Sequence, residues 1–485
     1  MASTLDLRDF SDRLSPMVVK ELRHGLRARM FTSILIGTHV LLIVLMSGAM
    51  LGVPQEMVHG MFWGGAALAF LLFMPLRGAG ALTQESQDGT LDMLILTSIS
   101  STRIVRGKWA ALMGQSLLLA ASLLPYMVAR YQWGGVEIVS ELVALLALLL
   151  GSALITAAVV AFSSQRSLIL RIFLGLAMMW PAWGVGMFVV MLAIEKSFSD
   201  SLFRELSLLP FWQQVMLIAG IIATMLYAVW LFLALGASRI APPSENHSTR
   251  KRLVYLAFTL FITALGWYVC LAIDDEAILW CIFPGAFLTI LAGIDMMTED
   301  LPRFPTVMMP FVEKPLLAPF PRLLAPGWAS GVLLYAVLSG LVWSMTISYV
   351  VQNKYADEMC SIFALLLTAA VVPVCIRLNK KNAFANWWAV QWALVAAGAL
   401  LSIFGAVTGG AGIGILSIFI PTTAFFGAAA SSGSFDEMLA AGAVIGFFWL
   451  LAAVIYGLSS GDDTYRSLLA EAKLLHEQEK RSDPS

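Results

Sequence analysis

The sequence predicts an all-α protein that crosses a membrane twelve or thirteen times. Of its 485 residues, 59% are hydrophobic and 13% are charged, whereas an ordinary soluble domain carries about 25% charged residues. The hydrophobic residues gather in runs of about 20, the length that a helix needs to cross the hydrocarbon core of a bilayer. The formal net charge of −1 gives no reason to expect a nucleic acid as partner.

Thirteen segments have the composition of a membrane-spanning helix. Six fall in the first half, near residues 31–53, 58–80, 109–129, 140–163, 168–194 and 214–237. Seven fall in the second half, near residues 253–273, 277–296, 328–350, 360–376, 385–406, 411–430 and 437–459. The glycine-rich segment 411–430 is the weakest of these, and a re-entrant segment buried by protein would explain it equally well. Twelve and thirteen spans therefore both remain open.

The distribution of basic residues predicts the orientation. Six Lys and Arg residues precede the first span. Alternating from there, most of the remaining basic residues up to about residue 381 fall in loops on that same side. Because cytoplasmic loops carry the excess of Lys and Arg, the N-terminus is expected in the cytoplasm.

Residues 1–30 are expected to contain a cytoplasmic amphipathic helix on the membrane surface. Ser15 and Pro16 make a good helix start. Apolar residues then repeat every four positions at Val18, Leu22, Leu26 and Met30, while Lys20, Arg23 and Arg27 fall on other faces. Such a basic amphipathic helix lies in the interface before the chain enters the first span. A plain basic anchor is the alternative.

The connection between the second and third spans is unusually polar. It reads QESQDGTLDMLILTSISSTRIVRGKW, from Gln84 to Trp109. Gly89 can end one short helix, and Thr90 can cap the next, with Asp92 near its positive end. Leu91 and Leu94 then share one apolar face. We call residues 82–108 the elbow. We expect it to be a compact set of short cytoplasmic helices with a shape that can dock onto a partner protein.

These motifs and their order relative to the spans resemble ABC-2 type permeases, the membrane subunits of ABC exporters. That family carries Lys-Glu-Leu in an N-terminal interfacial helix, then Glu and Gly-Thr-Leu-Glu, Leu-Leu-x-Thr, and Gly-Lys at the entry to the third span. Here Asp92 stands where the family usually has Glu. The matching positions are Lys20, Glu21, Leu22, Glu85, Gly89, Thr90, Leu91, Thr97, Gly107 and Lys108.

The resemblance implies a six-span permease domain over residues 31–237, in a multi-pass protein of the bacterial inner membrane. The chain would bind no cofactor and catalyse no reaction, because a separate ABC ATPase subunit would hold ATP and Mg. A second copy or a related permease would complete a dimer among membrane lipids. The elbow would contact the ATPase through Glu85, Gly89, Thr90, Leu91, Asp92, Leu94, Thr97, Gly107 and Lys108, and the interfacial helix would contribute Lys20, Glu21, Leu22, Arg23 and Arg27.

The second half has no second copy of the elbow sequence. A basic linker, 238–252, leads to an additional membrane domain, 253–459, of six or seven spans. The proline-rich loop after its second span, near residues 298–327, is expected to be extended and semi-rigid. The tail, 460–485, reads as an amphipathic helix with one face formed by Tyr465, Leu468, Ala472 and Leu475.

The span interiors appear almost free of ionisable residues in the sequence. His39 and Asp295 are the main candidates. We expect His39 to bond a neighbouring helix and Asp295 to be interfacial. Ion-coupled transport is therefore less expected, and no nucleophile, metal or phosphate-loop motif is found. A non-ABC secondary transporter and a scaffold for an envelope complex remain the alternatives to an exporter subunit.

Overall fold

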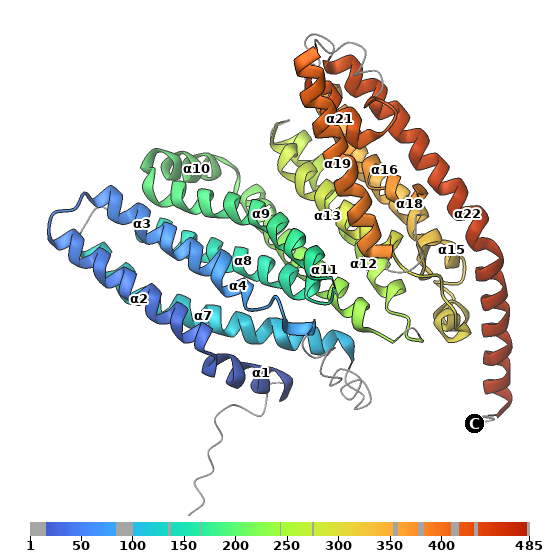
Figure 1. Ribbon diagram of the computed structural model, residues 1–485, viewed down its shortest axis with the longest axis horizontal. Coiled ribbons are helices and arrows are strands. Elements are labelled where there is room, and N and C mark those ends of the chain that lie inside the picture. The colour runs from blue at the N-terminus through green and yellow to red at the C-terminus, as the bar shows by residue number, and fades with distance from the viewer. Residues whose placement is uncertain are drawn as a thin grey trace, which may run out of the picture. The chain divides into compact units, whose positions relative to one another are not determined.

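Helices are the only regular secondary structure in the residues that the structure describes, and no strand occurs among them (Figure 1). It is a computed structural model. It describes residues 16–83, 100–133, 137–165, 167–242, 244–273, 276–352, 357–376, 383–408, 417–430 and 435–482. The chain divides into two compact units, Met1–Ala241 and Pro242–Ser485. The predicted all-α membrane protein is confirmed.

Twelve helices in the described residues are long and apolar enough to cross a membrane. They correspond to the predicted spans, with segment 411–430 left out. The described part of that segment holds only the short helix α21, Pro421–Ala430, which packs against α17, α19 and α22 of its own unit. Within the described residues, twelve of the thirteen predicted spans are therefore present as long apolar helices.

Unit 1 is a bundle whose central helix is α8. Its elements are α1 (Pro16–Arg27), α2 (Arg29–Met50), α3 (Gln55–Ala67), η1 (Leu68–Phe73), α4 (Met74–Leu76), α7 (Ser101–Trp133), α8 (Ile138–Phe162), α9 (Leu168–Ile194), α10 (Lys196–Leu208) and α11 (Phe211–Ile240). Helix α8 packs against α7, α9 and α11. Small side chains such as Ser152, Thr156 and Ala161 let its neighbours approach closely. At one crossing, Gly236 of α11 lies directly against the backbone of Ala161.

The second span of unit 1 is interrupted by a π-helical segment. Helix α3 continues through η1 into α4 as one apolar stretch. Pro75 in α4 has no N–H with which to bond the carbonyl of Leu71, so regular α-helical bonding cannot persist here. Single π-helical turns inside α-helices occur frequently at functional sites.

Unit 2 is a second helical bundle. Its elements are α12 (Ser248–Ala272), η2 (Glu276–Ile278), α13 (Leu279–Met297), η3 (Pro305–Met308), α14 (Met309–Glu313), α15 (Pro321–Leu324), α16 (Trp328–Gln352), α17 (Asp357–Ala369), α18 (Val372–Ile376), α19 (Ala383–Thr408), α21 and α22 (Phe435–Ser482). The proline-rich loop is not simply extended. It forms three short helical pieces, η3, α14 and α15, each with a proline in its first two positions, where the missing N–H does no harm.

The last predicted span and the amphipathic tail form one continuous helix of 48 residues, α22. Three of the four residues predicted to share the apolar face of the tail, Tyr465, Leu468 and Ala472, are buried, while Leu475 is 36% exposed. The buried face lies against η3 and α14. The tail is therefore part of the fold of unit 2.

A close contact between α13 and α16 gives a stability prediction. A Cβ added at Gly331 would lie 2.5 Å from the backbone carbonyl oxygen of Met296, whereas a Cβ at Gly340 of the same helix would meet nothing within 4 Å. We expect Gly331→Ala to destabilise the protein by about 1–3 kcal/mol through overpacking. Gly340→Ala should be neutral or stabilising, because alanine is the better helix former. Thermal unfolding in detergent compares the two variants, and equal midpoints would contradict the contact.

Candidate functional site

Helix α1 is held against the start of α7 by an ion pair. The Lys108 ammonium lies 3.2 Å from a Glu21 carboxylate oxygen, and both side chains are largely shielded from solvent. One turn away, Gly107 lets Met17 approach so closely that a Cβ would lie 2.8 Å from the Met17 Cγ. Two motifs that are far apart in the sequence therefore meet in space.

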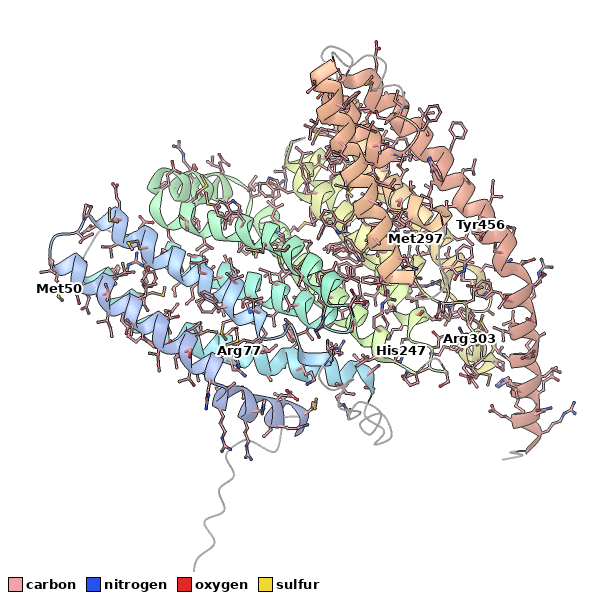
Figure 2. The ribbon with its side chains drawn as sticks, in the orientation of Figure 1. Met50, Arg77, His247, Met297, Arg303 and Tyr456 are labelled. Atoms are coloured by element: carbon pink, nitrogen blue, oxygen red, sulfur yellow. The ribbon has the colours of Figure 1, made fainter. Side chains whose placement is uncertain are left out.

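Arg77 anchors the last turn of α1 (Figure 2). Its guanidinium donates to the backbone carbonyl of Gly25 at 3.0 Å and to the side-chain carbonyl of Gln115 in α7. It also lies over the Phe31 ring, 5.1 Å from the centroid. Because Arg77 follows α4 directly, α1, α4 and α7 are joined at one end of the bundle. We call this set of contacts the α1–α7 junction.

The basic face of α1 is exposed to solvent. Lys20, Arg23 and Arg27 are exposed, whereas Glu21 and Leu22 are half-buried against the bundle. The helix ends at Arg27, and Ala28 has an extended conformation that turns the chain into α2. This arrangement fits the predicted amphipathic helix, although Met30, predicted for its apolar face, is 44% exposed.

Most of the elbow lies outside the described residues. This applies to Glu85, Gly89, Thr90, Leu91, Asp92, Leu94 and Thr97. The structure describes both edges of the elbow. Thr83 donates to the backbone carbonyl of Ser163, and α7 begins at Ser101 with a bond from Arg103 N–H to Ser100 C=O. The α1–α7 junction thus contains the last two residues of the elbow, Gly107 and Lys108, together with Arg77, which precedes the elbow in the chain.

A buried ion pair in unit 1 was missed by the sequence analysis. Arg130 of α7 lies 3.1 Å from Glu141 of α8, and each side chain is only 2% exposed. Trp63 donates to the same carboxylate at 3.0 Å, and the Arg130 guanidinium sits 4.1 Å from the centre of the Phe62 ring. The sequence does contain a signal for this pair, because the opposite charges of Arg130 and Glu141 lie on either side of a short connection between two helices.

His39 behaves as predicted. Its Nδ1 lies 3.1 Å from the hydroxyl of Tyr126 on α7, so it forms a hydrogen bond between neighbouring helices. No cluster of three or more potential metal-ligating side chains occurs in the described part of the chain. The polar contacts of unit 1 therefore serve mainly to join helices.

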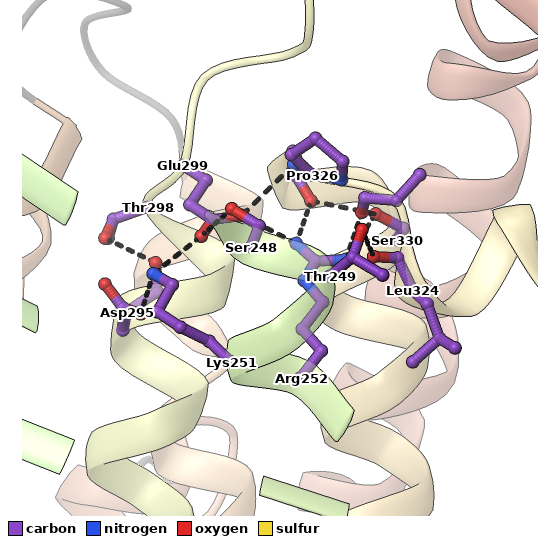
Figure 3. A network of polar contacts seen from close by, with 12 residues as sticks. Ser248, Thr249, Lys251, Arg252, Asp295, Thr298, Glu299, Leu324, Pro326 and Ser330 are labelled. Atoms are coloured by element: carbon purple, nitrogen blue, oxygen red, sulfur yellow. Dashed lines mark hydrogen bonds and ion pairs between the residues drawn. The ribbon is translucent and has the colours of Figure 1, made fainter. Parts of the chain in front are cut away.

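Unit 2 contains a larger polar cluster at the start of α12 (Figure 3). Lys251 lies 2.6 Å from Asp295 and 3.1 Å from Glu299, and Arg252 lies 2.8 Å from Glu299. Tyr255 adds a hydrogen bond to Asp295 at 2.9 Å. Two cations and two carboxylates thus neutralise each other, and we call these four ionised residues the α12 cluster.

The α12 cluster corrects the extent of the predicted basic linker. Lys251 and Arg252, assigned to a basic linker over 238–252, lie in the first turns of α12 and are buried, because α11 extends to Ile240 and α12 begins at Ser248. Asp295 is 1% exposed within unit 2, and its position at the membrane interface stays a prediction. Counting basic residues by loop cannot tell a solvated charge from one that has a buried partner.

The α12 cluster fastens four elements together. Arg252 donates to the backbone carbonyl of Gly327 at 2.8 Å and to the Ser330 hydroxyl of α16 at 2.6 Å. Ser330 and Tyr465 of α22 lie 3.0 Å apart, hydroxyl to hydroxyl. Gly327 has φ +113°, a conformation that favours glycine. Figure 3 shows these groups converging from α12, the end of α13, the start of α16 and the preceding loop.

The comparisons with known proteins add no relative. No protein-family model, curated protein or solved structure matches the chain. The family resemblance described above therefore rests on the short motifs and their topological order.

Removal of one cation should test the α12 cluster. Lys251→Met leaves Asp295 and Glu299 short of a buried partner, and breaking a buried pair from one side destabilises by about 3–5 kcal/mol. Arg250→Met removes an exposed charge from the adjacent position and should change stability little. Chemical or thermal unfolding in detergent gives the comparison. A Lys251→Met protein as stable as Arg250→Met would show that the ion pairs do not hold unit 2 together.

The acid stability of unit 2 should depend on Glu299. Burial favours its neutral form, but Lys251, Arg252 and hydrogen bonds from Ser248 and the Gly327 N–H outweigh burial and lower its pKa from 4.5 to about 2. Because the folded-state pKa is depressed, this stabilisation is complete above about pH 4.5 and is lost as pH falls toward 2. Unfolding midpoints measured across this window should drop for the wild type, and the Glu299→Gln variant should lose that component of the drop.

Proposed function

We propose that this chain is the membrane-spanning permease subunit of an ATP-driven exporter of the ABC-2 type. ATP hydrolysis, with its bound ATP and Mg, would belong to a separate ABC ATPase subunit, and the permease would act as a dimer with a second copy or a related permease. The observation that carries the proposal is the Glu21–Lys108 ion pair. It joins the Lys-Glu-Leu motif to the Gly-Lys motif, the two ends of the pattern on which the family resemblance rests.

The α1–α7 junction gives the proposal a mechanical basis. Movement of the ATPase is received by the elbow, between α4 and α7. Helix α7 has 33 residues and crosses the bundle from that edge. Because Lys108 and Arg77 tie α1 to α7 and α4, a push on the elbow displaces these helices together. Closure of the ATPase is thereby converted into a rearrangement of unit 1.

The membrane surface completes this mechanism. The exposed Lys20, Arg23 and Arg27 of α1 are suited to the anionic cytoplasmic face of a bacterial inner membrane. An α1 that lies on this surface limits changes in the tilt of α7 across the membrane. Unit 2, which lacks the elbow sequence, acts as an added membrane domain.

The proposal is tested by charge reversal across the α1–α7 junction. The tagged chain is purified in mild detergent from its native host, and the ATPase activity of the co-purifying subunit is measured. We expect Lys108→Glu to lower stimulation of that activity by roughly fivefold or more, within the usual range of coupling energies of about 1–3 kcal/mol. The double variant Glu21→Lys with Lys108→Glu should recover stimulation, and Lys473→Glu, which reverses an exposed lysine on α22 outside the junction, serves as the control.

The elbow itself gives a second readout. Glu85→Lys or Asp92→Lys should uncouple the ATPase without loss of membrane insertion, and deletion of residues 89–91 should abolish co-purification. Unchanged stimulation in all of these variants would contradict the proposal. Transport driven by an ion gradient without ATP would support a secondary transporter, and co-purification with an envelope assembly but no ATPase would support a scaffold.

A further inference from the structure

Unit 1 carries an apolar groove with a single charged residue in its lining. The groove lies between the α3–η1–α4 stretch, α8 and α9, and it has a volume of about 670 Å³. Its lining in the described residues is apolar except for Ser163 and Arg171. Exposed apolar side chains are what any membrane span presents to lipid. A concave apolar surface that ends at a guanidinium is a more specific feature.

The groove has the length of a lipid acyl chain. It runs from Gly64 to Ala79 on one wall, which corresponds to about 22 Å of helix. One leaflet accounts for about half of the ~30 Å hydrocarbon core, so an extended chain fits within it. Gly64 and Gly175 keep the groove open, because a Cβ at either position would meet nothing within 4 Å.

Arg171 lies at the end of the groove next to the elbow. Its Nη1 donates to the Thr83 hydroxyl at 3.1 Å, and its buried Nε has no hydrogen-bond partner in the described part of the chain. No carboxylate described by the structure forms an ion pair with it. A cation beside hydrocarbon is costly without a counter-ion. The groove is therefore suited to a ligand that combines an anionic group with an apolar chain.

A second copy of the chain does not supply that anion through α9. Helix α9 is the exposed wall of the groove, and its sequence, LILRIFLGLAMMWPAWGVGMFVVMLAI, contains no Asp or Glu. A two-fold contact made by this face would bring Arg171 no partner. A membrane lipid supplies both the phosphate and the chains.

We propose that this groove is a binding site for an anionic membrane phospholipid, with the phosphate on Arg171 and an acyl chain along η1 and α9. The lipid neutralises Arg171 and fills the space left open by Gly64 and Gly175. It also packs against the π-helical segment, which is the irregular part of this span. This site does not depend on the exporter proposal, because its geometry belongs to unit 1 alone.

The proposal is tested by native mass spectrometry of the delipidated full-length protein. Phosphatidylglycerol and phosphatidylcholine with identical acyl chains are titrated separately. We expect phosphatidylglycerol to bind roughly tenfold more tightly, because both lipids offer a phosphate but only phosphatidylcholine also carries a quaternary ammonium, which the Arg171 cation repels. Arg171→Gln should remove this preference and Arg171→Lys should retain part of it. Arg204→Gln removes the same charge from an exposed position on α10 and should leave the preference unchanged.

A matched pair of variants tests the apolar part of the site. Gly175→Leu should fill the groove and weaken both lipids severalfold, whereas Gly37→Leu, which also points into open space but on α2 outside the groove, should weaken neither. Equal binding of the two lipids by the wild type, or an undiminished preference in Arg171→Gln, would overturn the proposal. A Gly175→Leu protein that loses its dimer while keeping its lipid affinity would also overturn it, since the groove would then be a subunit contact.

Discussion

A charge that is removed from water must meet an opposite charge, and the packing of both units depends on this constraint. In unit 1, Arg130 and Glu141 pair where α7 passes into α8. In unit 2, the α12 cluster pairs two cations with two carboxylates. Each pairing brings together helices that apolar packing alone would let slide, because lipid offers no hydrophobic penalty against sliding. The ion pairs fix the ends of these helices, and the apolar parts of the same helices are positioned with them.

The α1–α7 junction applies the same principle at an edge. Glu21 and Lys108 are less deeply buried than the pairs in the interior, so their contact can open at a lower energetic cost. Stronger pairs hold the bundle, and a weaker pair lies beside the elbow. This difference in burial is what the proposed coupling mechanism needs, because the bundle must keep its fold while the junction moves.

The spans were predictable because hydropathy is a local property of the chain. The elements between them were predictable where a proline or a charge pattern acts locally, as at Pro16 of α1. The partners of the buried charged residues were not predictable in this way. Lys251 and Arg252 resembled a solvated linker because their partners, Asp295 and Glu299, are more than forty residues away. Segment 411–430 had the hydropathy of a span, but only tertiary packing decides whether such a segment crosses. The elbow residues from Glu85 to Thr97 lie outside the described residues, so their roles stay predictions.

Helix α22 has a geometric consequence for whatever lies outside the bilayer. Its 48 residues correspond to about 72 Å, more than twice the ~30 Å hydrocarbon thickness. Tyr465, Leu468 and Ala472 are buried against the body of unit 2, and residues 473–482 continue the helix for about 15 Å beyond them. The length of the helix therefore sets the distance between its last turns and the rest of unit 2. A molecule that binds these last turns is held at a fixed distance from the body of unit 2 and rotates together with it.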